Sequence, residues 1–222
     1  MSVLNFGRTL RHTVLALLLA GAASVAAAAT YHVDIDTSAY AGTGYLDLSF
    51  IAGNSDAAAA TATVSNFSGA LGALMSQDGD VSGTLAGTAS FGNGSFYNDV
   101  YHAVTLGGLF SFDVNFSGSF LSASSNSGTT FAVGLLDATQ GAYLGAEPAL
   151  LTFELASNNG VTAAGVTPTT FSGIATIGAV SAVPEPSAWL LLLGGVAVVL
   201  VSARRHRRDG AFQGAPVSGK TY

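Results

Sequence analysis

Residues 110–117 read Phe-Ser-Phe-Asp-Val-Asn-Phe-Ser, so large apolar side chains alternate strictly with polar ones. A period of two puts the apolar set on one face of an extended chain and the polar set on the other. This is the pattern of a half-buried β-strand. The stretch therefore predicts a strand whose phenylalanines and valine face a core, while its polar residues face water.

The same alternation recurs on both sides of this stretch, at residues 31–36, 46–50, 131–135 and 151–155. Turn-forming clusters of Gly, Asn, Ser and Asp separate the runs, at residues 53–56, 92–94, 125–128 and 158–160. Many short strands in about 150 residues predict an all-β domain, an antiparallel β-sandwich or jelly-roll-like fold rather than a barrel. The expected core residues are Leu46, Leu48, Phe50, Phe110, Phe112, Phe116, Phe131 and Phe153. Residues 57–60 fit one turn of helix or a loop, and residues 178–183 fit a short linker.

Charge is distributed very unevenly along the 222-residue chain. Of 13 acidic residues, 11 lie within residues 30–182, whereas all seven Lys and Arg lie outside this range. A domain without Lys or Arg is not expected to bind nucleic acid or anionic phospholipid, because contacts to phosphate need these residues. The absence of Cys excludes a disulfide framework, a thiolate metal site and a Cys nucleophile.

The N-terminus has the order of a secretory signal peptide. Arg8 and Arg11 form a short basic region, an apolar run follows over residues 13–23, and four alanines over residues 26–29 supply small side chains for cleavage. The apolar run is short for a membrane span, which needs about 20 residues. We therefore expect signal peptidase to remove residues 1–29, and an uncleaved N-terminal anchor is the alternative.

The C-terminal part holds three elements in order. Pro184-Glu185-Pro186 favours an extended chain and opposes a helix start before Ser187. An uncharged apolar run of 17 residues follows over residues 187–203, and as a helix it would span roughly 25 Å, near the thickness of the hydrocarbon core. The third element is a basic cluster, Arg204, Arg205, Arg207 and Arg208. Such a cluster predicts a stop-transfer signal on the cytoplasmic side of the membrane.

This order resembles the PEP-CTERM sorting domain, the substrate signal of exosortases in Gram-negative bacteria. The resemblance covers residues 183–208, and residues 209–222 add a polar tail beyond the usual end of the pattern. It implies recognition at Pro184, Glu185 and Pro186, followed by cleavage and transfer to the cell surface or release. It also implies transient anchoring in the inner membrane and an association with exopolysaccharide and biofilm. A plain single-pass anchor is the alternative.

The chain then divides into a signal peptide (1–29), an exported domain (30–182), a sorting signal (183–208) and a polar tail (209–222). Within the exported domain, two pairs of carboxylates are candidates for Ca²⁺, which prefers six to eight oxygen ligands. Asp34 and Asp36 share one face of a predicted strand, and Asp78 and Asp80 flank Gly79 in a predicted turn. Neither pair has the spacing of an EF-hand, and turn-forming, solubilising aspartates are the alternative.

Signs of catalysis are weak. Ser95, Asp99 and His102 lie close in sequence, but a turn followed by a strand with His102 near a surface explains them equally well. Glu147 and Glu154 are the only glutamates of the exported domain, and a pair of carboxylates would serve glycoside hydrolysis only at the right separation in space.

The sequence therefore predicts a non-enzymatic protein of the cell surface or extracellular matrix, delivered by exosortase sorting. A Ca²⁺-dependent glycan-binding adhesin is the first alternative, and it would use exposed aromatics such as Tyr97, Tyr101 or Tyr143. A secreted glycan-active enzyme is the second alternative.

Overall fold

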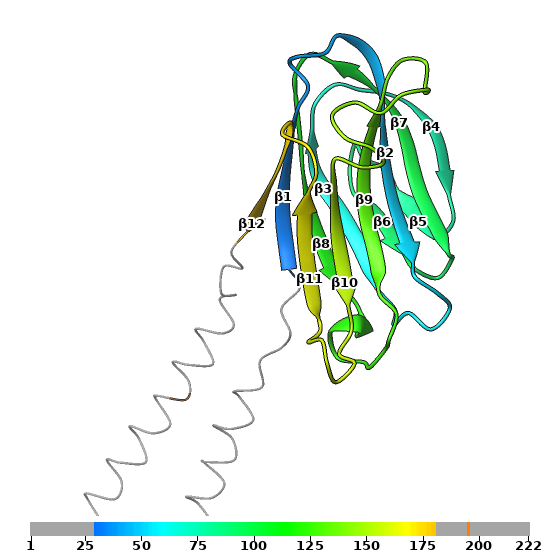
Figure 1. The fold of residues 1–222 in the computed structure, drawn as a ribbon. Coiled ribbons are helices and arrows are strands. Elements are labelled where there is room, and N and C mark those ends of the chain that lie inside the picture. The colour runs from blue at the N-terminus through cyan, green and yellow to red at the C-terminus, as the bar shows by residue number, and fades with distance from the viewer. Residues whose placement is uncertain (1–28, 181–194, 196–222) are drawn as a thin grey trace, which may run out of the picture. The chain divides into compact units, whose positions relative to one another are not determined.

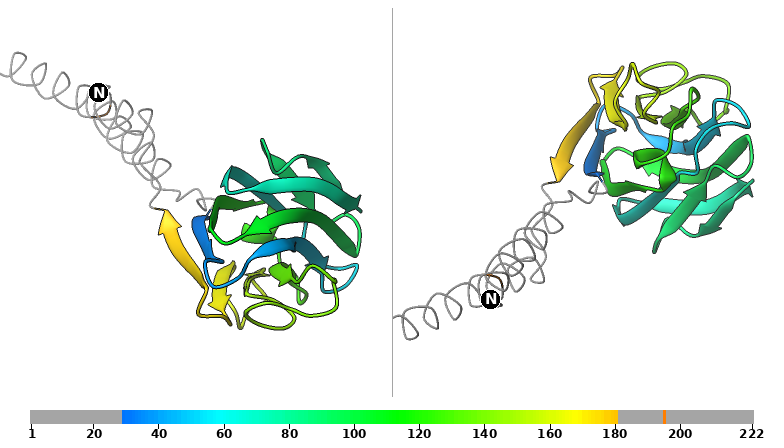
Figure 2. Two further views of the ribbon diagram at one scale, coloured as in Figure 1. Left: turned by 90° about the horizontal axis from the view of Figure 1, so that it is seen from above. Right: turned by 90° about the horizontal axis from the view of Figure 1, so that it is seen from below.

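Two antiparallel sheets of six strands each form the part of the chain that the computed structural model describes, residues 29–180 and Gly195. In one sheet, here sheet A, the strand order is β12 (Ala175–Val180), β1 (Ala29–Asp36), β8 (Leu109–Ser117), β3 (Thr61–Ser68), β6 (Ala89–Gly92) and β5 (Val81–Gly83). In the other, sheet B, it is β11 (Gly165–Thr170), β10 (Leu151–Ala156), β9 (Thr129–Leu136), β2 (Gly42–Ala52), β7 (Tyr97–Leu106) and β4 (Leu71–Asp78). A single 3₁₀ turn, η1 (Ser119–Leu121), is the only helix in residues 29–180. The two layers are visible from both ends in Figure 2.

The core lies between the inner faces of the two sheets (Figure 1), and it is built as the alternation predicts. All eight expected core residues are at most 1% exposed. Phe131 of β9 packs at the centre, with ring centroids 5.6 to 6.3 Å from those of four other phenylalanines, Phe50, Phe91, Phe116 and Phe153. Aromatic pairs at such distances add to the stabilisation that comes from burial alone.

The first and last strands of the sandwich are neighbours. β12 pairs with β1 in antiparallel register, so that Thr30 faces Val180 and Ile35 faces Ala175. The chain therefore enters and leaves the sandwich at adjacent points of one sheet end.

One expectation is wrong in part, and one open alternative is decided. Residues 178–180 were expected in a linker but belong to β12. Hydrogen bonds to β1 extend the strand over these residues, and their own sequence pattern does not predict this pairing. Residues 57–60 form a loop rather than a turn of helix. The predicted signal peptide, Pro-Glu-Pro segment and basic cluster lie outside the described residues, as does the predicted apolar helix apart from Gly195.

Candidate binding surface on sheet B

Aspartate and tyrosine side chains gather on the outer face of sheet B, where β2 and β7 are neighbouring strands. The inward positions of β2 carry Leu46 and Leu48, so the residue between them, Asp47, points outward. The register places Asp47 opposite Tyr101 of β7, and it places Asp99 of β7 opposite Ser49 of β2. We call this region the tyrosine–aspartate surface and define it by Tyr45, Asp47, Asp78, Tyr97, Asp99, Tyr101 and Tyr143.

Two carboxyl groups at the middle of the surface are shielded from water and lack partners. Asp99 is only 7% exposed, and the Oδ1 atoms of Asp47 and Asp99 accept no hydrogen bond from the described residues. Burial, aided by the charge of Asp99, raises the pKa of Asp47 to about 6. Burial also raises the pKa of Asp99, and Asp78, its cross-strand partner on β4, adds to this effect. Burying a carboxylate without a hydrogen-bond partner is unfavourable. A ligand that donates a hydrogen bond to these oxygens would therefore remove this cost.

Tyrosine rings flank the carboxyl groups. Tyr45 and Tyr101 stack with centroids 5.3 Å apart and planes 11° from parallel. Tyr97 and Tyr143 are 45% and 38% exposed, so much of each ring faces solvent. Burial of its hydroxyl raises the pKa of Tyr97 to about 12, and the negative charges of Asp47 and Asp99 contribute. The surface therefore combines aromatic faces with hydrogen-bond acceptors.

Tyr143 reaches this surface through the loop that follows β9. The carboxylate of Asp137 accepts hydrogen bonds from the backbone N–H groups of Thr139 and Gly141 at 3.1 Å, which tightens the turn. The chain then returns beside β9, where Tyr143 bridges to Leu136. Gly134 lies opposite Asp47 on β9, and a Cβ there would be 3.6 Å from Tyr143 Cε1. The lack of a side chain at Gly134 therefore lets the Tyr143 ring and the Pro148 carbonyl lie close to the sheet beside Asp47.

The predicted calcium ligands do not gather at one place. Asp34 and Asp36 share a face of β1, but Asp34 lies 3.4 Å from His32 Nε2, and Asp36 accepts a hydrogen bond from the Ser38 backbone. Asp78 belongs to the tyrosine–aspartate surface, whereas the carboxylate of Asp80 lies over Gly92 of β6. Within residues 29–180, no three His, Asp or Glu side chains form a group that could hold a metal ion. Calcium binding stays a prediction.

A separate polar group lies on the outer face of sheet A. His32 Nδ1 is 2.6 Å from Asp113 Oδ1, and Asn66 Nδ2 donates to Asp113 Oδ2 at 2.7 Å. The hydrogen bond to Asp113 raises the pKa of His32. The bonds from Asn66 and then His32 hold the pKa of Asp113 below its ordinary value. This arrangement is an ion pair below the pKa of the histidine.

The candidate catalytic groups are not brought together. His102 was expected near a surface, but it lies buried on the inner face of β7, while Asp99 faces outward. The strand alternation itself separates them, since positions three apart point to opposite faces. Glu154 accepts a hydrogen bond from Thr130 Oγ1 at 2.8 Å on the outer face of sheet B, and Glu147 lies exposed in the loop before β10.

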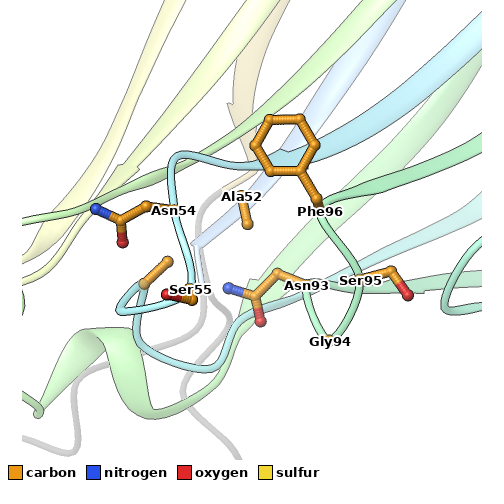
Figure 3. Close-up of a pocket in the computed structure, with 8 residues that line it drawn as sticks. Ala52, Asn54, Ser55, Asn93, Gly94, Ser95 and Phe96 are labelled. Atoms are coloured by element: carbon orange, nitrogen blue, oxygen red, sulfur yellow. The ribbon is translucent and has the colours of Figure 1, made fainter.

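A shallow pocket of about 330 Å³ lies where β2 ends and β7 begins (Figure 3). Its lining includes Asn54, Asn93 and Phe96. The amide of Asn93 is fully engaged, because it accepts from the Ala60 N–H and donates to the Ala58 carbonyl and the Thr129 hydroxyl. Asn93 therefore holds the loop in place, and its amide has no donor left for a ligand in the pocket.

Tyr97, Tyr101 and Tyr143 were expected as exposed aromatics, and the structure brings all three to one surface. Asp99 was considered only beside Ser95 and His102 as a weak catalytic candidate, and its pairing with Asp47 was not foreseen. Asp47 and Asp99 come from strands whose pairing partners lie about 50 positions apart in the sequence, and no local motif reports that register.

The comparisons with known proteins concern the C-terminal segment. Residues 182–208 match the family model of the PEP-CTERM protein-sorting motif, which starts one residue before the predicted signal. No curated protein and no solved structure matches the chain. In the part of the chain that the structure describes, no helix has the length and apolar character to cross a membrane. The motif implies an exosortase as processing partner, and it implies export and sorting to the cell surface. The chain thus carries a PEP-CTERM protein-sorting motif at residues 182–208.

Proposed function

We propose that this chain is a non-enzymatic protein of the cell surface or extracellular matrix, and that its sandwich holds extracellular polysaccharide through the tyrosine–aspartate surface. One observation carries the proposal: buried carboxyl oxygens without partners lie between tyrosine rings on the outer face of sheet B. Tyrosine offers an apolar face and a hydroxyl, which together suit a sugar ring. The sorting motif supports the proposal, because it implies delivery to the cell surface.

A second candidate function is glycan hydrolysis, and the raised pKa values of Asp47 and Asp99 favour it. A pair of carboxyl groups, one of them with a raised pKa, can cleave a glycosidic bond by acid–base chemistry when their separation in space fits. The shared arrangement makes both functions depend on the same residues, so the experiment has to separate binding from turnover.

The test is electrophoresis of the full-length chain, in non-ionic detergent, through gels that contain a neutral, an amino-bearing or an acidic polysaccharide. We expect at least one polysaccharide to retard the chain, and the double variant Tyr97→Ala/Tyr101→Ala to migrate freely. Phe171→Ala, which removes an exposed ring from the loop between β11 and β12, is the control and should be retarded like the native chain.

Assays for new reducing ends on the same polysaccharides separate the two functions. Retention without reducing ends supports the binding role. Reducing ends that disappear in Asp47→Asn would replace it with hydrolysis, and equal migration in every gel would contradict both.

A further inference from the structure

We infer that the polysaccharide bound by the tyrosine–aspartate surface carries free amino groups, and that Asp47 and Asp99 receive its ammonium groups. This inference rests on the proposed function and names the class of sugar.

The unpaired oxygens of Asp47 and Asp99 require hydrogen-bond donors. An ionised carboxylate can only accept hydrogen bonds, and the Oδ1 atoms of Asp47 and Asp99 accept none from the described residues. Asp99 is more than nine-tenths buried, so bulk water satisfies it poorly. A ligand at this place has to bring donors, and an ammonium group brings three together with the opposite charge.

Little positive charge is available within residues 30–182 to compensate these two carboxyl groups. The exported domain has no Lys or Arg that could neutralise these carboxyl groups. His32, the exposed histidine, is engaged by Asp113 on the outer face of the other sheet. The cross-strand partner of Asp99 is a further carboxylate, Asp78, which increases the repulsion. An acidic polysaccharide would be repelled here, whereas a cationic one relieves the repulsion.

The tyrosine rings beside these carboxyl groups also attract a cation. Ammonium groups are attracted to the faces of tyrosine rings within about 6 Å, and the attraction grows when the site is partly desolvated. Tyr101 lies opposite Asp47, and Tyr97 and Tyr101 flank Asp99 along β7. Carboxylates between aromatic rings form a receptor for a cation that also carries an apolar surface.

The width of the tyrosine–aspartate surface favours a polymer over a small cation. The surface extends across β9, β2, β7 and β4, a width of about 14 Å at the usual strand spacing. On β9, the positions opposite Asp47 and Ser49 are Gly134 and Ala132, and the Tyr143 ring and the Pro148 carbonyl lie close over Gly134. An extended chain of sugar rings can cover this area, whereas a single small amine covers one carboxyl group.

The experiment is isothermal titration of the full-length chain, in non-ionic detergent at one near-neutral pH, with a glucosamine hexamer and with its fully N-acetylated counterpart. The two probes share ring and linkage, and they differ in the charge of the nitrogen. We expect the amine form to bind about tenfold more tightly, because charge-assisted hydrogen bonds are about twice as strong as neutral ones.

Variants locate the effect. Asp47→Asn and Asp99→Asn keep the shape and remove the charge, and each should erase most of the preference for the amine form. Asp56→Asn removes the same charge from the exposed loop after β2 and should leave the preference unchanged. Tyr101→Ala should weaken binding of both hexamers.

Each other outcome overturns part of the reasoning. If both hexamers bind equally and Tyr101→Ala weakens both, the proposed function stands and the inference is wrong. If Asp56→Asn lowers the preference as much as Asp47→Asn does, the attraction is nonspecific and the inference is wrong. If poly-lysine binds through Asp47 and Tyr101 while no polysaccharide does, the surface serves a protein partner. In that case, and if nothing binds, both proposals fail.

Discussion

At the scale of single residues, the outer faces of the two sheets treat carboxyl groups in opposite ways. Asp113 on sheet A has His32 and Asn66 as donors at 2.6 and 2.7 Å. Asp47 on sheet B keeps an oxygen without any partner among the described residues. The first arrangement stabilises the ionised carboxylate and the second opposes it, so the two sites respond to pH with opposite sign.

Asp47→Asn should stabilise the protein at neutral pH. Burial raises the pKa of Asp47 from 3.8 to about 6 in the folded state, so this group lowers stability as pH rises through that range. The shift corresponds to at most about 3 kcal/mol at pH 7, and the gain should vanish by about pH 2.5, where the carboxyl group is protonated in both states. Chemical denaturation of both proteins at these two pH values measures the difference. A gain of equal size at both would contradict this account, and Asp56→Asn should change little at either.

His32→Gln should destabilise the protein at acidic pH, and the effect should fade as pH rises. The folded pKa of His32 is raised, mainly by its bond to Asp113, so its contribution is complete below about pH 6.5 and is lost as pH rises through the folded value. The pKa of Asp113 is lowered, so the pair also weakens as pH falls below about 4. The loss should reach at most about 1 kcal/mol, as for other exposed ion pairs.

Thermal unfolding of native and His32→Gln protein at about pH 5.5 and about pH 8.5 tests this window. Asn66→Ala is the matched control, because its bond to Asp113 does not depend on the histidine charge. The cost of Asn66→Ala should therefore persist at the higher pH. If His32→Gln were equally costly at both pH values, its effect would be packing rather than charge.

At the scale of strands, sequence alternation predicts which residues are inside but not which strands meet. The runs around Leu48, Phe112 and Phe153 lie in β2, β8 and β10 with the expected faces inward. The neighbours of each strand depend on long-range register, which no local pattern encodes. The tyrosine–aspartate surface is a product of that register, so its tyrosines were predictable singly and its carboxyl pair was not.

Inward polar residues are the other limit of the alternation. Asn98 of β7 is fully buried, because its amide accepts from the Asp80 N–H and donates to the carbonyls of Phe50 and Ser95. His102 is buried on the same face. A hydrophobicity pattern treats such residues as solvent-facing, and only the tertiary hydrogen bonds make their burial favourable.

Phe131→Ala should be among the most damaging single changes in the sandwich. The side chain is fully buried on β9 and contacts phenylalanines of both sheets, so truncation leaves a cavity that joins the two layers. The expected loss is about 3–5 kcal/mol in the free energy of unfolding, measured by urea denaturation of residues 29–181. Phe171→Ala, at a 57% exposed position in the loop between β11 and β12, should cost less than about 0.5 kcal/mol. Similar losses for the two variants would contradict the packing described.

At the scale of the whole molecule, negative charge is a general cost of this fold. Residues 30–182 carry 11 carboxylates without a Lys or Arg, so folding brings like charges together with little internal compensation. Three of these carboxylates, Asp47, Asp78 and Asp99, lie on one face of sheet B. A polycation at that face would lower the repulsion in the same step in which it binds.

The unfolding temperature of the sandwich should therefore rise with NaCl, because screening acts over a Debye length of about 8 Å at physiological ionic strength. CaCl₂ at matched ionic strength should add a saturable increase if Asp34 with Asp36, or Asp78 with Asp80, binds the ion. Asn substitutions in each pair assign such an increase. A response to NaCl alone would remove the calcium sites, and indifference to both salts would contradict the argument from charge.

The pairing of Thr30 with Val180 also decides how the sandwich responds to mechanical force. When force pulls the start of β1 and the end of β12 away from each other, the hydrogen bonds between these strands break one after another. When the sandwich is held through its C-terminal end alone and pulled along β12, all bonds of that pair resist together in shear. Pulling the sandwich by its C-terminal end along β12 therefore loads the β1–β12 pair in its stronger direction.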